Sequence, residues 1–291
     1  MNALFSGICT ALITPFKDNR IDFTAFKKIV DFQIKSGTDA ILFMGTTGEA
    51  STICFDEKLD IIRFASKTIG TSMPIIFGIG GNNPNEIIKL GLSVKELCPH
   101  AAVMLTAPYY NKCTQGAVTK HFHTIANKLE LPMIVYNIPS RTGMNIQPKT
   151  MYEICRNKYI TGIKESSGDM TQIIETVRLC PNTPVYCGDD ALSLPCYAVG
   201  CAGCFSVASN VRPKETRAIW QNKNTKFGST LFKKEIPCYN ALFCEVNPGP
   251  IKYACYLAGL CQPDLRPPLT RPTEESILQH GFCKFFKPAR D

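Results

Sequence analysis

The chain has 291 residues, a formal charge of +8 and 45% hydrophobic residues. This length suits a single (β/α) barrel, and the modest positive charge is spread along the chain without the basic run typical of a nucleic-acid arm. No stretch approaches the ~18 apolar residues of a membrane span, so we expect neither a nucleic acid nor a membrane as a partner.

Eight short apolar runs recur along the chain, and several are β-branched and nearly continuous. Such runs are typical of strands that are buried on both faces of a parallel sheet. We therefore predict strands over Ile8–Ile13, Ala40–Met44, Pro74–Ile79, Ala101–Leu105, Pro132–Tyr136, Ile160–Ile163, Val185–Cys187 and Cys204–Val207.

Amphipathic stretches lie between these runs and predict helices. They cover Asp22–Ser36, Glu57–Ile69, Asn85–Leu97, Gly116–Leu129, Pro148–Arg156, Met170–Leu179 and Asp190–Val199. Asp22 and Asp56 are expected N-caps, and Gly37 and Gly70 are expected helix ends. Pro148 suits the first turn of its helix.

Eight strand-then-helix units predict a closed (β/α)8 TIM barrel. An open doubly wound sheet is the alternative, but no Gly-rich dinucleotide loop follows the first strand. After about residue 223 only helical patterns remain, over Thr225–Cys244, Pro248–Leu260 and Thr273–Phe282. We therefore expect a barrel domain (1–223) and a C-terminal helical extension (224–291).

Catalytic groups of such barrels come from the C-terminal ends of the strands. Lys164 follows Ile160–Ile163, so its side chain leaves an apolar strand end. Burial there disfavours the ammonium form and leaves an amine that can attack a ketone. The alternative is a lysine that extends to solvent or pairs with Glu165.

Two other strand ends, after Pro132–Tyr136 and after Ala40–Met44, carry polar candidate side chains. Tyr136 ends the neighbouring strand, where its phenol could reach Lys164 and transfer protons. Thr46 and Thr47 lie in a Gly-flanked turn whose N–H and hydroxyl groups can bind a carboxylate. Arg141 offers a donor fork to a second carboxylate. The alternatives are a core tyrosine, an ordinary βα turn and a surface ion pair.

Fifteen cysteines are scattered along the chain, mostly in apolar runs where cysteine serves as a small buried side chain. The only CxxC pair, Cys201 and Cys204, lacks a second ligand pair at zinc spacing, so we expect no metal. The odd count and the absence of a secretory leader favour a cytoplasmic protein.

Four motifs carry a resemblance to a known family: GTTGEA, PYYN, YNIPSRTG and GIKESSGD, in this order and spacing. They resemble the 4-hydroxy-tetrahydrodipicolinate synthase (dihydrodipicolinate synthase) family, which belongs to the N-acetylneuraminate lyase superfamily of class I aldolases. The resemblance runs from about Gly7 to about Leu269, and CGDD, FSVASN and EVNPGPIK strengthen it.

The resemblance implies a lyase of lysine and diaminopimelate biosynthesis that condenses pyruvate with L-aspartate 4-semialdehyde, without metal or organic cofactor. It also implies a homotetramer made of two tight dimers. The resemblance further implies that Lys164 forms the imine and that Tyr136, Thr46 and Tyr110 form a proton relay, with Tyr110 reaching the neighbouring subunit's site. It implies that Thr46 and Thr47 bind the pyruvate carboxylate and that Arg141 binds the semialdehyde. The pocket is expected to be lined near Gly188 and Phe205.

Members of the family that are inhibited by lysine bind it at the dimer interface. The matching positions here are Ser51, Phe55, Lys58, Asn82, Glu86 and Tyr109. A histidine is usual where Lys58 stands, and a cation there should repel lysine. We therefore predict weak or absent lysine feedback. Gly249 also departs from the family, which usually has an aliphatic residue there, and we have no functional account of it.

Two alternatives to this function remain at the level of sequence. N-acetylneuraminate lyase and the keto-sugar-acid aldolases share the lysine and the tyrosine but generally lack the arginine of PSRTG, so Arg141 is the residue that discriminates between them. The second alternative is a non-catalytic, ligand-binding barrel. Against it stands the complete set of Lys164, Tyr136, Thr46 and Tyr110.

Overall fold

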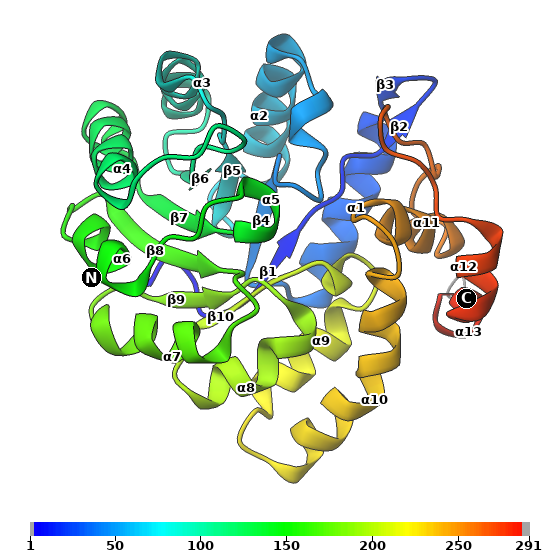
Figure 1. The fold of residues 1–291 in the computed structure, drawn as a ribbon. Helices are drawn as coiled ribbons and strands as arrows, with labels where there is room; N and C mark the ends of the chain where they lie inside the picture. The colour runs from blue at the N-terminus through cyan, green and yellow to red at the C-terminus, as the bar shows by residue number, and fades with distance from the viewer. Residues whose placement is uncertain (1–2, 287–291) are drawn as a thin grey trace.

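The computed structural model describes residues 3–286. Its centre is a closed barrel of eight parallel strands in which the first strand pairs with both the second and the last strand of the barrel (Figure 1). The barrel strands are β1 (Gly7–Ala11), β4 (Ala40–Phe43), β5 (Ile75–Gly78), β6 (Ala102–Thr106), β7 (Met133–Asn137), β8 (Ile160–Glu165), β9 (Val185–Cys187) and β10 (Gly203–Ser206). The predicted (β/α)8 barrel is confirmed.

The strands are buried on both faces because successive side chains alternate between two cores. One core fills the barrel and is built from small and medium side chains with a few aromatic rings, including Cys9, Leu42, Met104, Tyr136 and Phe205. The other lies between the barrel and the surrounding helices. The continuous apolar runs of the sequence are the consequence of these two cores.

Helices surround the barrel as expected (Figure 1). They are α1 (Phe23–Ser36), α2 (Phe55–Ile69), α3 (Pro84–Leu97), α4 (Gln115–Leu129), α6 (Pro148–Cys155), α7 (Met170–Leu179), α8 (Ser193–Ala198) and α9 (Pro213–Gln221). Three predicted helix limits are confirmed: Asp22 accepts hydrogen bonds from the N–H groups of Thr24 and Ala25, and Gly37 and Gly70 are C-caps with positive φ.

Two predicted helix starts are wrong. Helix α2 is capped by Cys54 and not by Asp56, because the Glu57 carboxylate turns back to accept the Cys54 N–H at 3.0 Å. The stretch predicted as one helix from Asp190 opens as a 3₁₀ turn over Asp190–Leu192 before α8 begins. The reason is that the Asp190 carboxylate accepts hydrogen bonds from the N–H groups of Val207 and Ala208, directly after β10.

Most strand limits differ from the prediction by one or two residues, and β8 extends to Glu165, so that Lys164 lies within the strand and not after it. The first strand ends at Ala11, because the Ile13 N–H donates to the Asn210 side chain and not to a neighbouring strand. The last strand ends at Ser206, because the Val207 N–H donates to Asp190. Three elements were not predicted: the hairpin β2–β3 (Phe16–Lys17 and Arg20–Ile21), the one-turn helix α5 (Pro139–Thr142) and α9.

The C-terminal part is helical and packs on one side of the barrel (Figure 1). It contains α10 (Lys226–Leu242), α11 (Gly249–Leu257), α12 (Glu274–Gln279) and α13 (Phe282–Phe285). The helix predicted over Thr273–Phe282 is therefore two short helices, separated at Gly281, whose φ is +61°. The predicted domain boundary near residue 223 stays a prediction. None of the helices within residues 3–286 has the length and apolar character needed to cross a membrane.

Candidate active site

Lys164 lies in β8 with its side chain inside the barrel, where only 5% of its surface is exposed. Its Nζ lies 4.1 Å from the centre of the Tyr136 ring and 5.2 Å from that of Phe205. The alternative pairing with Glu165 is wrong, since Glu165 faces the opposite side of the sheet and accepts hydrogen bonds from Asn137 and Ser167. Among the described residues, no carboxylate forms an ion pair with Lys164.

Tyr136 reaches Lys164 because the two residues are register partners on the neighbouring strands β7 and β8. The tyrosine is almost fully buried and lines the cavity described below. A phenol held against a primary amine can donate and accept protons during imine chemistry. Strand order and register thus bring together the two side chains that the sequence placed at successive strand ends.

The turn after β4 carries Thr46 and Thr47 and is closed by backbone hydrogen bonds from Gly48 to Gly45 and from Glu49 to Thr46. Met44 and Glu49, at its two ends, have positive φ values of 53° and 55°. Such strained non-glycine residues often occur at functional sites. Thr46 lines the cavity, whereas Thr47 is buried behind it and bonds to Asn247.

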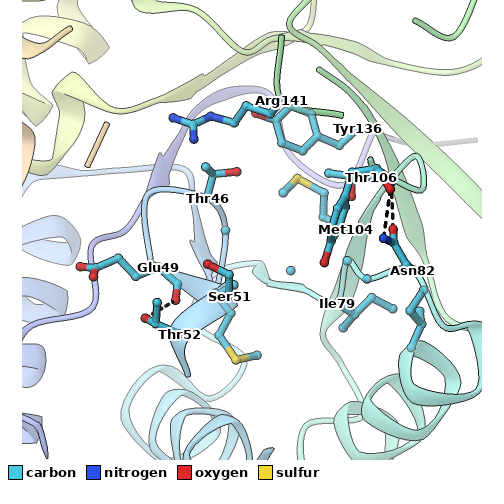
Figure 2. Close-up of a pocket in the computed structure, with 18 of the residues that line it drawn as sticks. Thr46, Glu49, Ser51, Thr52, Ile79, Asn82, Met104, Thr106, Tyr136 and Arg141 are labelled. Carbon is cyan, nitrogen blue, oxygen red and sulfur yellow. Dashed lines mark hydrogen bonds between the residues drawn. The ribbon is translucent and has the colours of Figure 1, made fainter. Parts of the chain in front are cut away.

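Arg141 lies in helix α5, directly after β7. Its Nη2 donates to the backbone carbonyl of Asn247 at 3.0 Å, and its side chain lines the cavity (Figure 2). The alternative of a surface ion pair is wrong, since no carboxylate of the described residues pairs with this guanidinium. Its free donors remain able to bind a carboxylate.

Gly188 and Phe205 shape the space around the lysine. A Cβ on Gly188 would lie 1.8 Å from Ser166 Oγ and 3.0 Å from Lys164 Cε, so a side chain there would displace the Ser166 hydroxyl and crowd Lys164. Phe205 is fully buried on β10, and the Lys164 amine lies over its ring. Both predicted residues therefore lie beside Lys164, although their contact with a substrate stays a prediction.

A cavity of about 650 Å³ opens over this part of the barrel. In Figure 2, Arg141, Tyr136 and Thr46 extend into its upper part and Ser51 lies below them. All six candidate interface residues line the same cavity, namely Ser51, Phe55, Lys58, Asn82, Glu86 and Tyr109. Asn82 is held by two hydrogen bonds to the Tyr109 backbone, at 2.9 and 3.0 Å.

Tyr110 is the one relay candidate that lies apart from the others. It is 92% exposed, has a φ of 70° and does not line the cavity. Within one chain it therefore cannot complete the relay. Its predicted place in the site of a neighbouring subunit stays a prediction.

The sequence did not predict two residues of the C-terminal helical part that contact the site. Asn247 precedes α11 and contacts both Thr47 and Arg141. Lys252 in α11 forms a fully buried ion pair with Glu49, which also accepts the Arg266 N–H. The motif EVNPGPIK contains both residues, but nothing in its local pattern indicates which turn they contact.

The cysteines do not form a metal centre or a disulfide. All fifteen are free, and within residues 3–286 no group of three or more His, Cys, Asp or Glu side chains is placed to hold a metal ion. Burial raises the pKa of the Cys9 thiol, which lies in the barrel near Lys164, well above its usual value. The CxxC pair lies in the apolar core.

Comparisons with known proteins agree with this geometry. A model of the dihydrodipicolinate synthetase family matches residues 4–281. The 4-hydroxy-tetrahydrodipicolinate synthase of Alkaliphilus oremlandii is 41% identical over 94% of each chain.

Two solved structures are similar throughout. The dihydrodipicolinate synthase of Aquifex aeolicus has a TM-score of 0.94 and 36% identity over 99% of this chain and 100% of its own. That of Acinetobacter baumannii, solved in complex with pyruvate, has a TM-score of 0.91 and 35% identity over 96% and 98%. The chain therefore belongs to the dihydrodipicolinate synthetase family.

Proposed function

We propose that this enzyme is a class I aldolase-type lyase that condenses pyruvate with L-aspartate 4-semialdehyde to 4-hydroxy-tetrahydrodipicolinate. This reaction is the first committed step of lysine and diaminopimelate biosynthesis. One observation carries the proposal: a buried lysine that pairs with no carboxylate of residues 3–286 lies against a tyrosine, beside a cavity whose wall carries Thr46 and Arg141.

The chemistry begins at the Lys164 amine. It attacks the pyruvate ketone, and loss of water from the carbinolamine gives an iminium. The iminium draws electrons from the methyl carbon, which loses a proton to give an enamine. Tyr136, with Thr46 and the Tyr110 of a neighbouring subunit, carries the protons, while Thr46 and Thr47 hold the pyruvate carboxylate. The covalent imine supplies the electron sink, so no cofactor is needed.

The second half of the reaction forms the ring. The enamine carbon attacks the aldehyde of the semialdehyde, whose oxygen takes a proton to become the hydroxyl group. The substrate amine then attacks the imine carbon, and transimination releases Lys164. Arg141 binds the semialdehyde carboxylate and so separates this reaction from those of N-acetylneuraminate lyase and the keto-sugar-acid aldolases.

Borohydride trapping tests this function. The protein is reduced with borohydride in the presence of pyruvate, the adduct is mapped by mass spectrometry, and condensation with aspartate semialdehyde is followed in a coupled assay. We expect an adduct on Lys164 and turnover. Absence of the adduct would contradict the central claim, and an adduct without turnover of the semialdehyde would favour another pyruvate-dependent aldolase. A non-catalytic barrel would give neither result.

The oligomer and the cellular compartment follow from the same proposal. We expect a homotetramer of two tight dimers in the cytoplasm, and the exposed Tyr110 supports a shared site. Mixed oligomers of Tyr110→Phe and Lys164→Ala subunits provide the test. If Tyr110 acts across the dimer, mixing restores activity, because a hybrid dimer has one site with both native residues. Activity that does not rise on mixing would contradict the shared site.

Lysine feedback should be weak. Lys58 lines the cavity, and burial lowers the pKa of its ammonium, so the repulsion of lysine is greatest at low pH and weakens as the pH rises. Inhibition by lysine is measured for the wild type and for Lys58→His, with Lys67→His, at an exposed position of the same helix, as the control. Sub-millimolar inhibition of the wild type would contradict this expectation.

A further inference from the structure

Asn247 has one polar atom without a partner at the cavity wall. The side chain is 7% exposed, lines the cavity and donates from Nδ2 to Thr47 Oγ1 at 3.0 Å. Its Oδ1 is buried and accepts no hydrogen bond from any residue in 3–286. A buried carbonyl oxygen left without a donor costs free energy, so such an atom at a binding cavity indicates a donor on the ligand.

The same residue places a guanidinium beside this free acceptor. The backbone carbonyl of Asn247 accepts from Arg141 Nη2 at 3.0 Å, which keeps the guanidinium next to the carboxamide. A guanidinium binds a carboxylate, and a carbonyl oxygen accepts from an ammonium. The two groups together are complementary to an α-amino acid head group, in which the carboxylate and the ammonium are attached to one carbon.

The carboxylates of the cavity do not provide another acceptor at this place. Glu49 is fully engaged by Lys252 and by the N–H of Arg266. Glu86 belongs to α3, on the wall that carries the interface residues. Asn247 Oδ1 is therefore a free acceptor on the same residue whose backbone carbonyl holds Arg141.

We propose that Asn247 recognises the α-ammonium group of the second substrate through Oδ1 while Arg141 binds the adjacent α-carboxylate. This inference rests on the proposed function and adds to it a specificity residue supplied by the C-terminal helical part. A site built to bond a substrate N–H group discriminates against an analogue that lacks it, because the acceptor then stays unpaired. Succinic semialdehyde is that analogue: it keeps the aldehyde and the carboxylate and has no amine.

The experiment compares the wild type with Asn247→Ala and Asn247→Asp at saturating pyruvate. For each protein we measure the KM for aspartate semialdehyde and the inhibition constant of succinic semialdehyde, and we express selectivity as the ratio of the inhibition constant to the KM. The alanine variant should lose selectivity by about tenfold or more, mainly through a higher KM. The aspartate variant keeps an acceptor and should keep the selectivity.

Two results would overturn the proposal. If Asn247→Ala weakens both ligands equally, Asn247 only supports Arg141 and Thr47. If Asn247→Asp loses selectivity as fully as Asn247→Ala does, an acceptor oxygen at this position does not bind the substrate ammonium group. The borohydride adduct on Lys164 is measured for every variant to show that the fold and the pyruvate site persist. Failure of the proposed function would differ, because the wild type itself would not turn over the semialdehyde.

Discussion

Two buried lysines, Lys164 in β8 and Lys252 in α11, show how the same type of side chain serves different roles. Lys252 is completely buried, forms an ion pair with Glu49 and lies 4.3 Å from the centre of the Phe16 ring. Lys164 is nearly as buried, but its amine contacts two aromatic rings and pairs with no carboxylate in the described part of the chain. Burial lowers the pKa of Lys252, and the charge of Glu49 opposes that shift.

The partner decides the role. An ion-paired ammonium has its charge compensated, and its removal leaves a buried carboxylate alone. An amine without such a partner is free to form a covalent bond with a ketone. Lys252 therefore attaches the C-terminal helical part to the Thr46–Thr47 turn, whereas Lys164 is available to the substrate.

Replacing Lys164 by Met should produce the largest change in activity. We expect a loss of at least about 10⁴-fold in condensation, because no other residue can form the imine. Stability should change little, since no buried ion pair is broken. The measurements are the coupled assay, borohydride trapping and urea unfolding. A Lys164→Met protein that still forms the pyruvate adduct would contradict the assignment.

The matched change, Lys252→Met, should show the reverse pattern. We expect it to lower the free energy of unfolding by about 3–5 kcal/mol while the pyruvate adduct on Lys164 persists, because an uncompensated Glu49 stays buried. Adding Glu49→Gln should restore part of this loss. If urea unfolding shows that the double variant is as unstable as the sum of the single variants, the two side chains are not energetically coupled.

Tyr136→Phe tests the hydroxyl while keeping the ring against the Lys164 amine. We expect turnover to fall by about 10²–10³-fold, since proton transfer loses its acid and base. Adduct formation with pyruvate should survive, at a lower rate. Stopped-flow measurement of the adduct separates the two effects, and unchanged turnover would remove Tyr136 from the relay.

Asp190 extends the comparison to a buried carboxylate, which forms no ion pair with a cationic side chain of the described residues. Burial raises its pKa to about 6, and hydrogen bonds from Ser206 and from two backbone N–H groups oppose the shift. The folded protein therefore keeps a proton that the unfolded chain has already lost above pH ~4. By linkage, this contribution to stability is fully present below pH ~4 and is lost as the pH rises through about 6.

The variant for this test is Asp190→Asn, which does not titrate. Unfolding by urea is measured between pH 4 and pH 7.5. The stability of the wild type relative to the variant should decline by up to about 3 kcal/mol over this range. The Arg266 guanidinium holds the pKa of the Glu57 carboxyl down to about 2, so the contribution of Glu57 to stability increases as the pH rises. This contribution is the same in both proteins and cancels in the difference of their stabilities. A difference that is independent of pH would contradict the raised pKa.

Much of the site could be predicted because it depends on local order. The alternation of side chains in β8 and the register with β7 suffice to bring Tyr136 to Lys164. Arg141 and the Thr46–Thr47 turn also follow strand ends that a barrel gathers on one face. The start of α2 depends on a local pattern that could have been recognised, because Glu57 accepts the Cys54 N–H three residues before it, as in a capping box. The break at Asp190 could not be predicted, because the N–H group that its carboxylate accepts belongs to Val207, 17 positions away.

The sequence by itself determined the barrel, its eight strands and the identity of the lysine at the end of one of them. These features rest on periodicity and on strand ends, which are properties of short segments. Only the tertiary structure decided which lysine is paired and which is free. The pairs Glu49–Lys252 and Thr47–Asn247 join residues about 200 positions apart, so burial and packing, and not any local pattern, select them.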